Sequence, residues 1–75
     1  MNISDVMIHI PENLNAGARS ALEARMRGLD GVIAPRFNPG KEHLLVVAFD
    51  PDKAHPADLL GAVKLAGYTA KLVGA

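Results

Sequence analysis

The chain has 75 residues, enough for one small domain built around a single hydrophobic core. Hydrophobic residues make up 49% of it and its formal net charge is zero, which favours a folded domain over a disordered one. The balanced charge argues against nucleic acid as a partner, because phosphate-binding proteins usually carry a basic excess. Cysteine is absent, which excludes disulfides, thiolate metal sites and thiol catalysis.

The sequence also predicts neither a signal peptide nor a membrane-spanning segment. The first residues lack the basic and then apolar segments of a signal peptide. No run of about 18 apolar residues is present, so no membrane-spanning segment is predicted. We therefore expect one domain over residues 1–75, located in the cytoplasm and without a membrane partner.

The first third of the chain predicts a strand followed by a helix. Apolar and polar residues alternate over 6–10, which is strand periodicity. A polar break over 11–15 follows, in which Asn13 or Asn15 can cap a helix. Helical periodicity then runs from 16 to about 28. The expected apolar side of this helix consists of Ala18, Ala21, Leu22, Met26 and Leu29.

The middle of the chain predicts a hairpin. Residues 32–37 form a short strand that contains Pro35, and since proline cannot donate to a sheet ladder, this strand should lie at an edge or carry a bulge. The sequence Asn-Pro-Gly-Lys at 38–41 favours a type II turn. The apolar run 44–49 is then a third strand, and its composition suits a central position.

The last third predicts a second helix and a fourth strand. Pro56 opens the helix after His55, because proline is tolerated at the first helical position. Gly67 suits the position after its C-terminus, where a positive φ is common. Residues 68–73 then alternate as a strand does. The expected core stripe of the helix is Leu59, Ala62, Val63 and Ala66.

The order β-α-β-β-α-β is that of a ferredoxin-like α+β sandwich. We expect a four-stranded antiparallel sheet in the order 4-1-3-2 with both helices on one face. This order places the proline-containing second strand at an edge, as its chemistry requires.

Several stretches resemble the heavy-metal-associated domain family of small copper chaperones and transport-ATPase metal domains. The similar stretches are Leu29-Asp30-Gly31-Val32, Val47-Ala48-Phe49-Asp50-Pro51, Leu59, Ala62-Val63 and Ala66-Gly67-Tyr68. The resemblance covers nearly the whole chain. It implies the same fold and a relation to metal-trafficking proteins.

The metal-binding motif of that family is absent. Its members carry a Met-x-Cys-x-x-Cys loop between the first strand and the first helix, where two thiolates bind a Cu(I)-type ion. Counted back from Gly31, the thiolate positions fall at about Asn15 and Ala18. Neither residue supplies the sulfur that soft copper prefers. No metal ligand therefore carries over from the family, and no cofactor is expected.

A rewired metal site is the alternative. His9 lies nearest to the position of that loop and Glu12 follows it, so these two are the candidate ligands for a divalent transition-metal ion. Tight sites need three or four protein ligands. Strand parity places His43 on the helix side and His9 on the opposite side, unless the hairpin is irregular. A symmetric dimer that brings two copies of His9 together is then the simplest route to a site. His55 is expected to be a turn residue.

Catalysis, anion binding and RNA binding find little support in the sequence. Ser4 and Ser20 have no adjacent histidine and carboxylate. Residues 13–17 with Arg19 could hold an anion at a helix N-terminus, but the glycine spacing matches no phosphate loop. RNA binding on an open sheet places stacking aromatic residues at the outward positions of the central strands, and no such aromatic platform is present there. We therefore expect a protein that is not an enzyme.

The side of the sheet without helices is the remaining candidate surface. The residues expected to point there are Met7, Leu44, Val46, Ala48 and Val73, with Ala34 as a further candidate. Contiguous exposed aliphatic area commonly marks an interface. The sequence thus predicts a module that contacts a partner protein or a second copy of itself. The predicted contact residues are Met7, His9, Leu44, Val46 and Val73.

Overall fold

The computed structural model describes residues 2–73. The elements follow the predicted order. They are β1 (Ser4–His9), α1 (Ala16–Arg27), β2 (Val32–Phe37), β3 (Leu44–Phe49), α2 (Pro56–Leu65) and β4 (Lys71–Val73).

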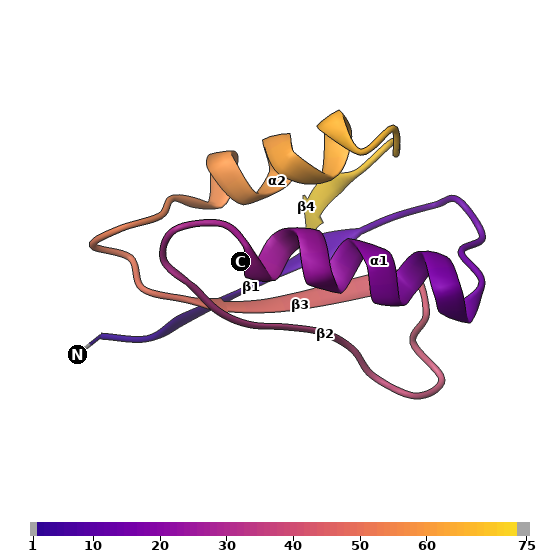
Figure 1. The fold of residues 1–75 in the computed structure, drawn as a ribbon, viewed down its shortest axis with the longest axis horizontal. Helices are drawn as coiled ribbons and strands as arrows, with labels where there is room; N and C mark the ends of the chain where they lie inside the picture. The colour runs from indigo at the N-terminus through magenta and orange to yellow at the C-terminus, as the bar shows by residue number, and fades with distance from the viewer. Residues whose placement is uncertain (1, 74–75) are drawn as a thin grey trace.

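The four strands form one antiparallel sheet in the order β2-β3-β1-β4, which is the predicted order read from the other edge (Figure 1). The ferredoxin-like fold is therefore confirmed. The proline-containing strand β2 lies at one edge, and the short strand β4 lies at the other.

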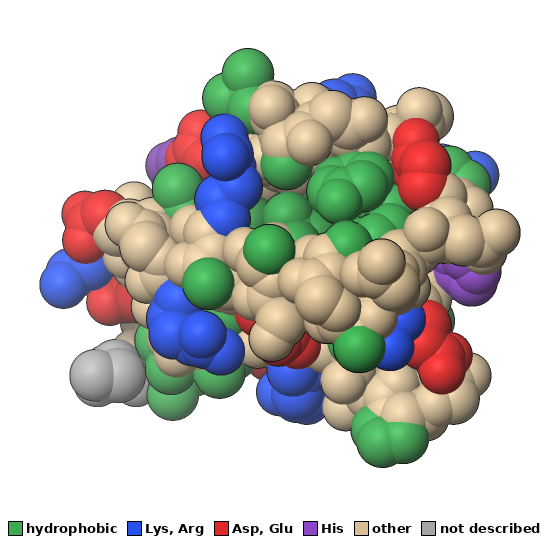
Figure 2. All heavy atoms as spheres, turned by 45° about the vertical axis from the view of Figure 1, so that its right-hand side comes forward, with side chains coloured by type: hydrophobic (Ala, Val, Ile, Leu, Met, Phe, Trp, Pro, Cys, Tyr) green, Lys and Arg blue, Asp and Glu red, His purple; other side chains and the backbone are tan. Residues whose placement is uncertain are grey.

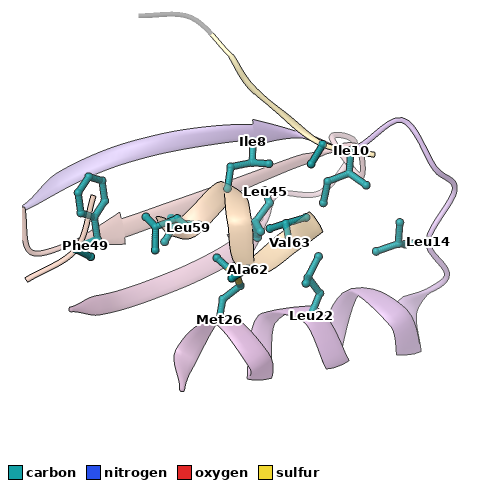
Figure 3. Close-up of a cluster of buried hydrophobic side chains, with 13 residues drawn as sticks. Ile8, Ile10, Leu14, Leu22, Met26, Leu45, Phe49, Leu59, Ala62 and Val63 are labelled. Carbon is teal, nitrogen blue, oxygen red and sulfur yellow. The ribbon is translucent and has the colours of Figure 1, made fainter. Parts of the chain in front are cut away.

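The hydrophobic core lies between one face of the sheet and the two helices (Figure 3). Alternate residues of β1 and β3 point into it, so that Ile8, Leu45 and Val47 have no exposed surface. The helices contribute Leu22, Met26, Leu59, Ala62 and Val63. The predicted core stripe of α2 is confirmed, with Ala66 partly buried against the cluster.

One residue of the predicted α1 stripe lies outside the core. Ala21 is exposed, whereas Leu22 and Met26 on the same helix are buried. Ala21 lines a shallow hollow between the helices, together with Ala66 and Tyr68. The helices do not close over this position, so the apolar stripe of α1 is narrower than its periodicity indicated.

The helix ends follow the predicted chemistry. Asn15 is the N-cap of α1, and its Oδ1 accepts a hydrogen bond from the backbone N–H of Ala18 at 2.8 Å. Pro56 is the first residue of α2. Gly67 follows the C-terminus of α2 with a φ of +102°. These local signals set where both helices begin and end.

The β2–β3 hairpin carries both predicted irregularities. The register shifts between Val32 and Ala34, so the edge strand is bulged as well as interrupted by Pro35. The turn is closed by a hydrogen bond from the N–H of Lys41 to the carbonyl of Asn38 at 3.0 Å, and Gly40 has a φ of +78°. A positive φ at this position is what a type II turn requires.

Gly31, in the loop between α1 and β2, contacts the loop between β3 and α2. Its carbonyl accepts from the N–H of Asp50 at 2.8 Å, and its φ is +88°. A Cβ at this position would lie 2.9 Å from the Cβ of Lys53 and 3.0 Å from that of Ala54. Glycine is therefore required here both by backbone conformation and by space.

Within residues 2–73, none of the helices has the length and apolar character needed to cross a membrane.

Candidate functional site

The open face of the sheet carries a row of apolar side chains. Met7 pairs with Val46 on β3 and with Val73 on β4, so the three side chains lie side by side across three strands. Met7 is 41% exposed and Val73 is 36% exposed, whereas Val46 is half-buried between its neighbours. We call these three residues the Met7 row. Arg36 on β2 pairs with Val46 and ends the row.

The rows on either side of the Met7 row are partly polar. On one side, His9 lies between Leu44 and Lys71. On the other side, Asp5 pairs with Ala48, which pairs in turn with Ala34. Because side chains alternate along a strand, all these residues share the face of the Met7 row.

The apolar area of this face is smaller than the sequence indicated. Leu44 and Val46 are half-buried, and Ala48 is 9% exposed because its short side chain is enclosed by the sheet. Met7 and Val73 are therefore the most exposed of the apolar residues predicted for this face. Their predicted position on the face without helices agrees with the pairing, while their role in binding stays a prediction.

Charged side chains of both signs are spread over the surface. Figure 2 shows Lys and Arg side chains interspersed with Asp and Glu side chains around a hydrophobic centre. The side of the molecule drawn in Figure 2 carries no basic stripe of the kind that follows a phosphate backbone.

The structure brings His9 and His43 together. Their ring centroids lie 6.2 Å apart with an angle of 31° between the ring planes. The sequence placed the two imidazoles on opposite faces unless the hairpin is irregular, and the second case applies, so the two rings are neighbours. His43 lies before β3 in a turn closed by the N–H of Leu44 and the carbonyl of Lys41, so the alternation of strand side chains does not apply to it.

A hydrogen bond holds the His43 ring beside β1. Its Nδ1 lies 2.8 Å from the carbonyl oxygen of Ile10, and the N–H of Ile10 donates to the carbonyl of His43 at 2.8 Å. The only signal of this contact in the sequence is the polar pair Glu42-His43 between the turn and the apolar strand. That pair indicates an irregular strand entry without naming its partner.

The Glu12 side chain connects the loop after β1 to the loop before β4. Its Oε2 accepts a hydrogen bond from the backbone N–H of Thr69 at 2.8 Å. This bond lowers the pKa of the Glu12 carboxyl below its ordinary value, because it stabilises the ionised form. The carboxylate therefore already has a structural partner, across 57 positions of sequence.

The other residues that the sequence analysis considered near a metal site do not lie together. His55 is the exposed N-cap residue of α2, and its backbone N–H donates to the Asp58 carboxylate at 3.3 Å. Across residues 2–73, no group of three or more His, Cys, Asp or Glu side chains could hold a metal ion. Asn15, at one of the positions where the resemblance places a thiolate, is a helix cap.

Comparison with other sequences gives no relative. No protein-family model matches the chain, and no curated protein matches it.

Comparison with solved structures gives several similar folds. The N-terminal domain of a potential copper-translocating P-type ATPase from Bacillus subtilis, solved with Cu(I) bound, is 27% identical with a TM-score of 0.82, over 95% of this chain and 88% of that one. Oxidized MerP from Ralstonia metallidurans CH34 is 20% identical with a TM-score of 0.82, over 95% and 97% of the two chains. A copper chaperone of Enterococcus hirae is 19% identical with a TM-score of 0.79, over 91% and 98%.

These neighbours bear out the resemblance that the sequence indicated. The chain thus has the fold of the heavy-metal-associated domains that it resembles, and its sequence contains no cysteine.

Proposed function

We propose that this domain is a non-catalytic interaction module that associates with a second copy of itself through the open face of its sheet. The observation that carries the proposal is the Met7 row. It places exposed Met7 and Val73 beside Val46 on a face that no helix covers. A partly exposed methionine suits such a contact, because its flexible side chain adapts to an opposing surface.

The row is suited to a two-fold interface. An axis that runs along the row, across the strands, lays Met7, Val46 and Val73 over the same residues of the second copy. The axis reverses the direction of the strands. Asp5 of each copy then lies over His9, and beside Lys71, of the other copy, since Asp5 precedes Met7 by as many residues as His9 follows it. The charges of Asp5 and Lys71 are therefore complementary in this arrangement.

The size of the face sets the expected strength of the dimer. A stable interface buries about 800 Å² on each partner. One face of a four-stranded sheet with a single exposed apolar row offers less apolar contact than this. We therefore expect a weak dimer, with a dissociation constant in the micromolar range or above.

The proposal assigns no reaction to the domain. The named neighbours include a copper chaperone and the N-terminal domain of a potential copper-translocating ATPase solved with Cu(I) bound, and neither description names a reaction of the domain itself. A cytoplasmic location is retained as a prediction.

The test is the oligomeric state of tag-free protein, in chelator, over a concentration series by sedimentation equilibrium. Met7→Glu places two carboxylates against each other at the axis and should weaken the dimer by about 100-fold, since like charges at an interface cost several kcal/mol. Leu65→Glu is the matched control, because Leu65 is 81% exposed on α2 and lies away from the open face. It should leave the dimer unchanged.

Two results would contradict the proposal. One is a wild-type protein that stays monomeric up to millimolar concentration. The other is a dimer that Met7→Glu and Leu65→Glu affect equally.

A further inference from the structure

The corner where β1 ends brings together two imidazoles that the chain separates by 33 residues. We infer that His9 and His43 of one chain form a site for a divalent transition-metal ion such as Zn²⁺, Ni²⁺ or Cu²⁺. Their ring centroids are 6.2 Å apart. Two imidazoles that bind one ion at about 2.0–2.1 Å have centroids roughly 5–6 Å apart, so the observed separation is close to the one that a shared ion requires.

The His43 ring is already fixed in a ligating tautomer. Its Nδ1 lies 2.8 Å from the carbonyl oxygen of Ile10, and a carbonyl can only accept a hydrogen bond. Nδ1 therefore carries the proton, and in the neutral ring Nε2 holds the free lone pair. Histidines that bind metals commonly donate their other ring N–H to a backbone carbonyl in this way.

The His9 ring contains a polar atom without a partner. Its Nδ1 is buried and has no hydrogen-bond partner among residues 2–73. Burial of such an atom without any hydrogen-bond partner is unfavourable. A hollow of about 210 Å³ lies beside His9 and is also lined by Pro11, Thr69 and Lys71. His43 is not among its lining residues, so this hollow lies on the β4 side of His9 and is not itself the place of the ion.

The surrounding charges limit the affinity. Lys71 pairs with His9 across β1 and β4, so its ammonium group opposes a cation there. The Glu12 carboxylate is bound to the N–H of Thr69 and is not counted as a ligand. Two protein ligands beside a lysine predict binding in the micromolar range or weaker, and Lys71→Gln should strengthen it. Imidazole ligands suit borderline divalent ions rather than Cu(I), which prefers sulfur.

The experiment is a titration of chelator-treated, tag-free protein with Zn²⁺, followed by calorimetry and by the NMR signals of the imidazole nitrogens. We expect one ion per chain, with shifts of the His9 and His43 nitrogens and none of His55. His9→Gln and His43→Asn should each lower the affinity by about 10-fold or more. His43→Asn retains an amide N–H for the Ile10 carbonyl while removing Nε2. His55→Gln is the matched control and should bind as the wild type does.

The inference is independent of the proposed dimer, and the same titration of the Met7→Glu variant shows this. Retained binding in that variant places the site within one chain, whereas loss of binding there overturns the single-chain site. Equal affinity in all three histidine variants also overturns it, as does a wild-type protein that takes up no Zn²⁺. If His43→Asn does not fold, the nitrogen shifts of the wild type decide the result.

Discussion

Strand β1 presents its two faces to different surroundings. Ile8 points toward the helices and has no exposed surface, while the preceding residue, Met7, is 41% exposed on the open face. Both side chains are apolar and the backbone is continuous, so the helices on one side make the difference. Apolar residues on the covered face stabilise the fold, and those on the open face are available for a contact. Substitutions on the two faces should therefore change different measured quantities.

The largest effect is expected on the covered face. Ile8→Ala should lower the free energy of unfolding by about 2–5 kcal/mol, because it leaves a cavity in a closed core. Met7→Ala should lower it by less than about 1 kcal/mol, since this side chain is already partly in water. Urea denaturation of both variants measures the difference. Equal losses would show that the open face also stabilises the monomer.

The next effect concerns the close contact between the loop before β2 and the loop after β3. Gly31→Ala forces a Cβ to within 2.9 Å of the Lys53 side chain at a φ of +88°. The expected loss is about 1–3 kcal/mol, from strain in this backbone region. Gly40→Ala is the control, because Gly40 also has a positive φ but has open space around its Cα. A larger loss at Gly31 than at Gly40 isolates the cost of the close contact.

A smaller effect is expected from charges on the open face. Asp5→Lys should weaken the dimer by about 5–10-fold and leave stability nearly unchanged, because exposed ion pairs contribute about 1 kcal/mol or less. The double variant Asp5→Lys with Lys71→Glu should recover the wild-type dimer in sedimentation equilibrium. A double variant no better than Asp5→Lys alone would exclude the two-fold arrangement along the Met7 row.

The smallest effect is expected from Glu12, in the loop between β1 and α1. Its pKa is lowered in the folded protein by the Thr69 N–H. The ionised carboxylate therefore stabilises the fold above its unfolded pKa of about 4.3. This contribution is lost as the pH falls from there through the lower folded value. Glu12→Gln should flatten the dependence of stability on pH in that acid range and change little at neutral pH. Thermal melts of both proteins from neutral to acid pH measure it.

The sequence by itself determined the order of the elements, most of their limits and the assignment of residues to the two faces. The strand limits 32–37 and 44–49 and the start of α2 at Pro56 agree with the structure. Local signals suffice here, because a cap, a turn glycine or a proline acts within a few residues. The sheet order was expected from the ferredoxin-like order of the elements, and the proline in 32–37 agrees with the edge position that this order gives its strand.

The tertiary structure alone decided which polar groups meet. The contact of His43 with Ile10 spans 33 positions and that of Glu12 with Thr69 spans 57. The first depends on the turn before β3, where strand parity does not hold, and the second on how the last loop returns beside the first. The exposure of Ala21 depends on the gap between the helices. Periodicity describes a side chain relative to its own element, whereas these contacts depend on how separate elements pack, and that packing is set only when the core closes.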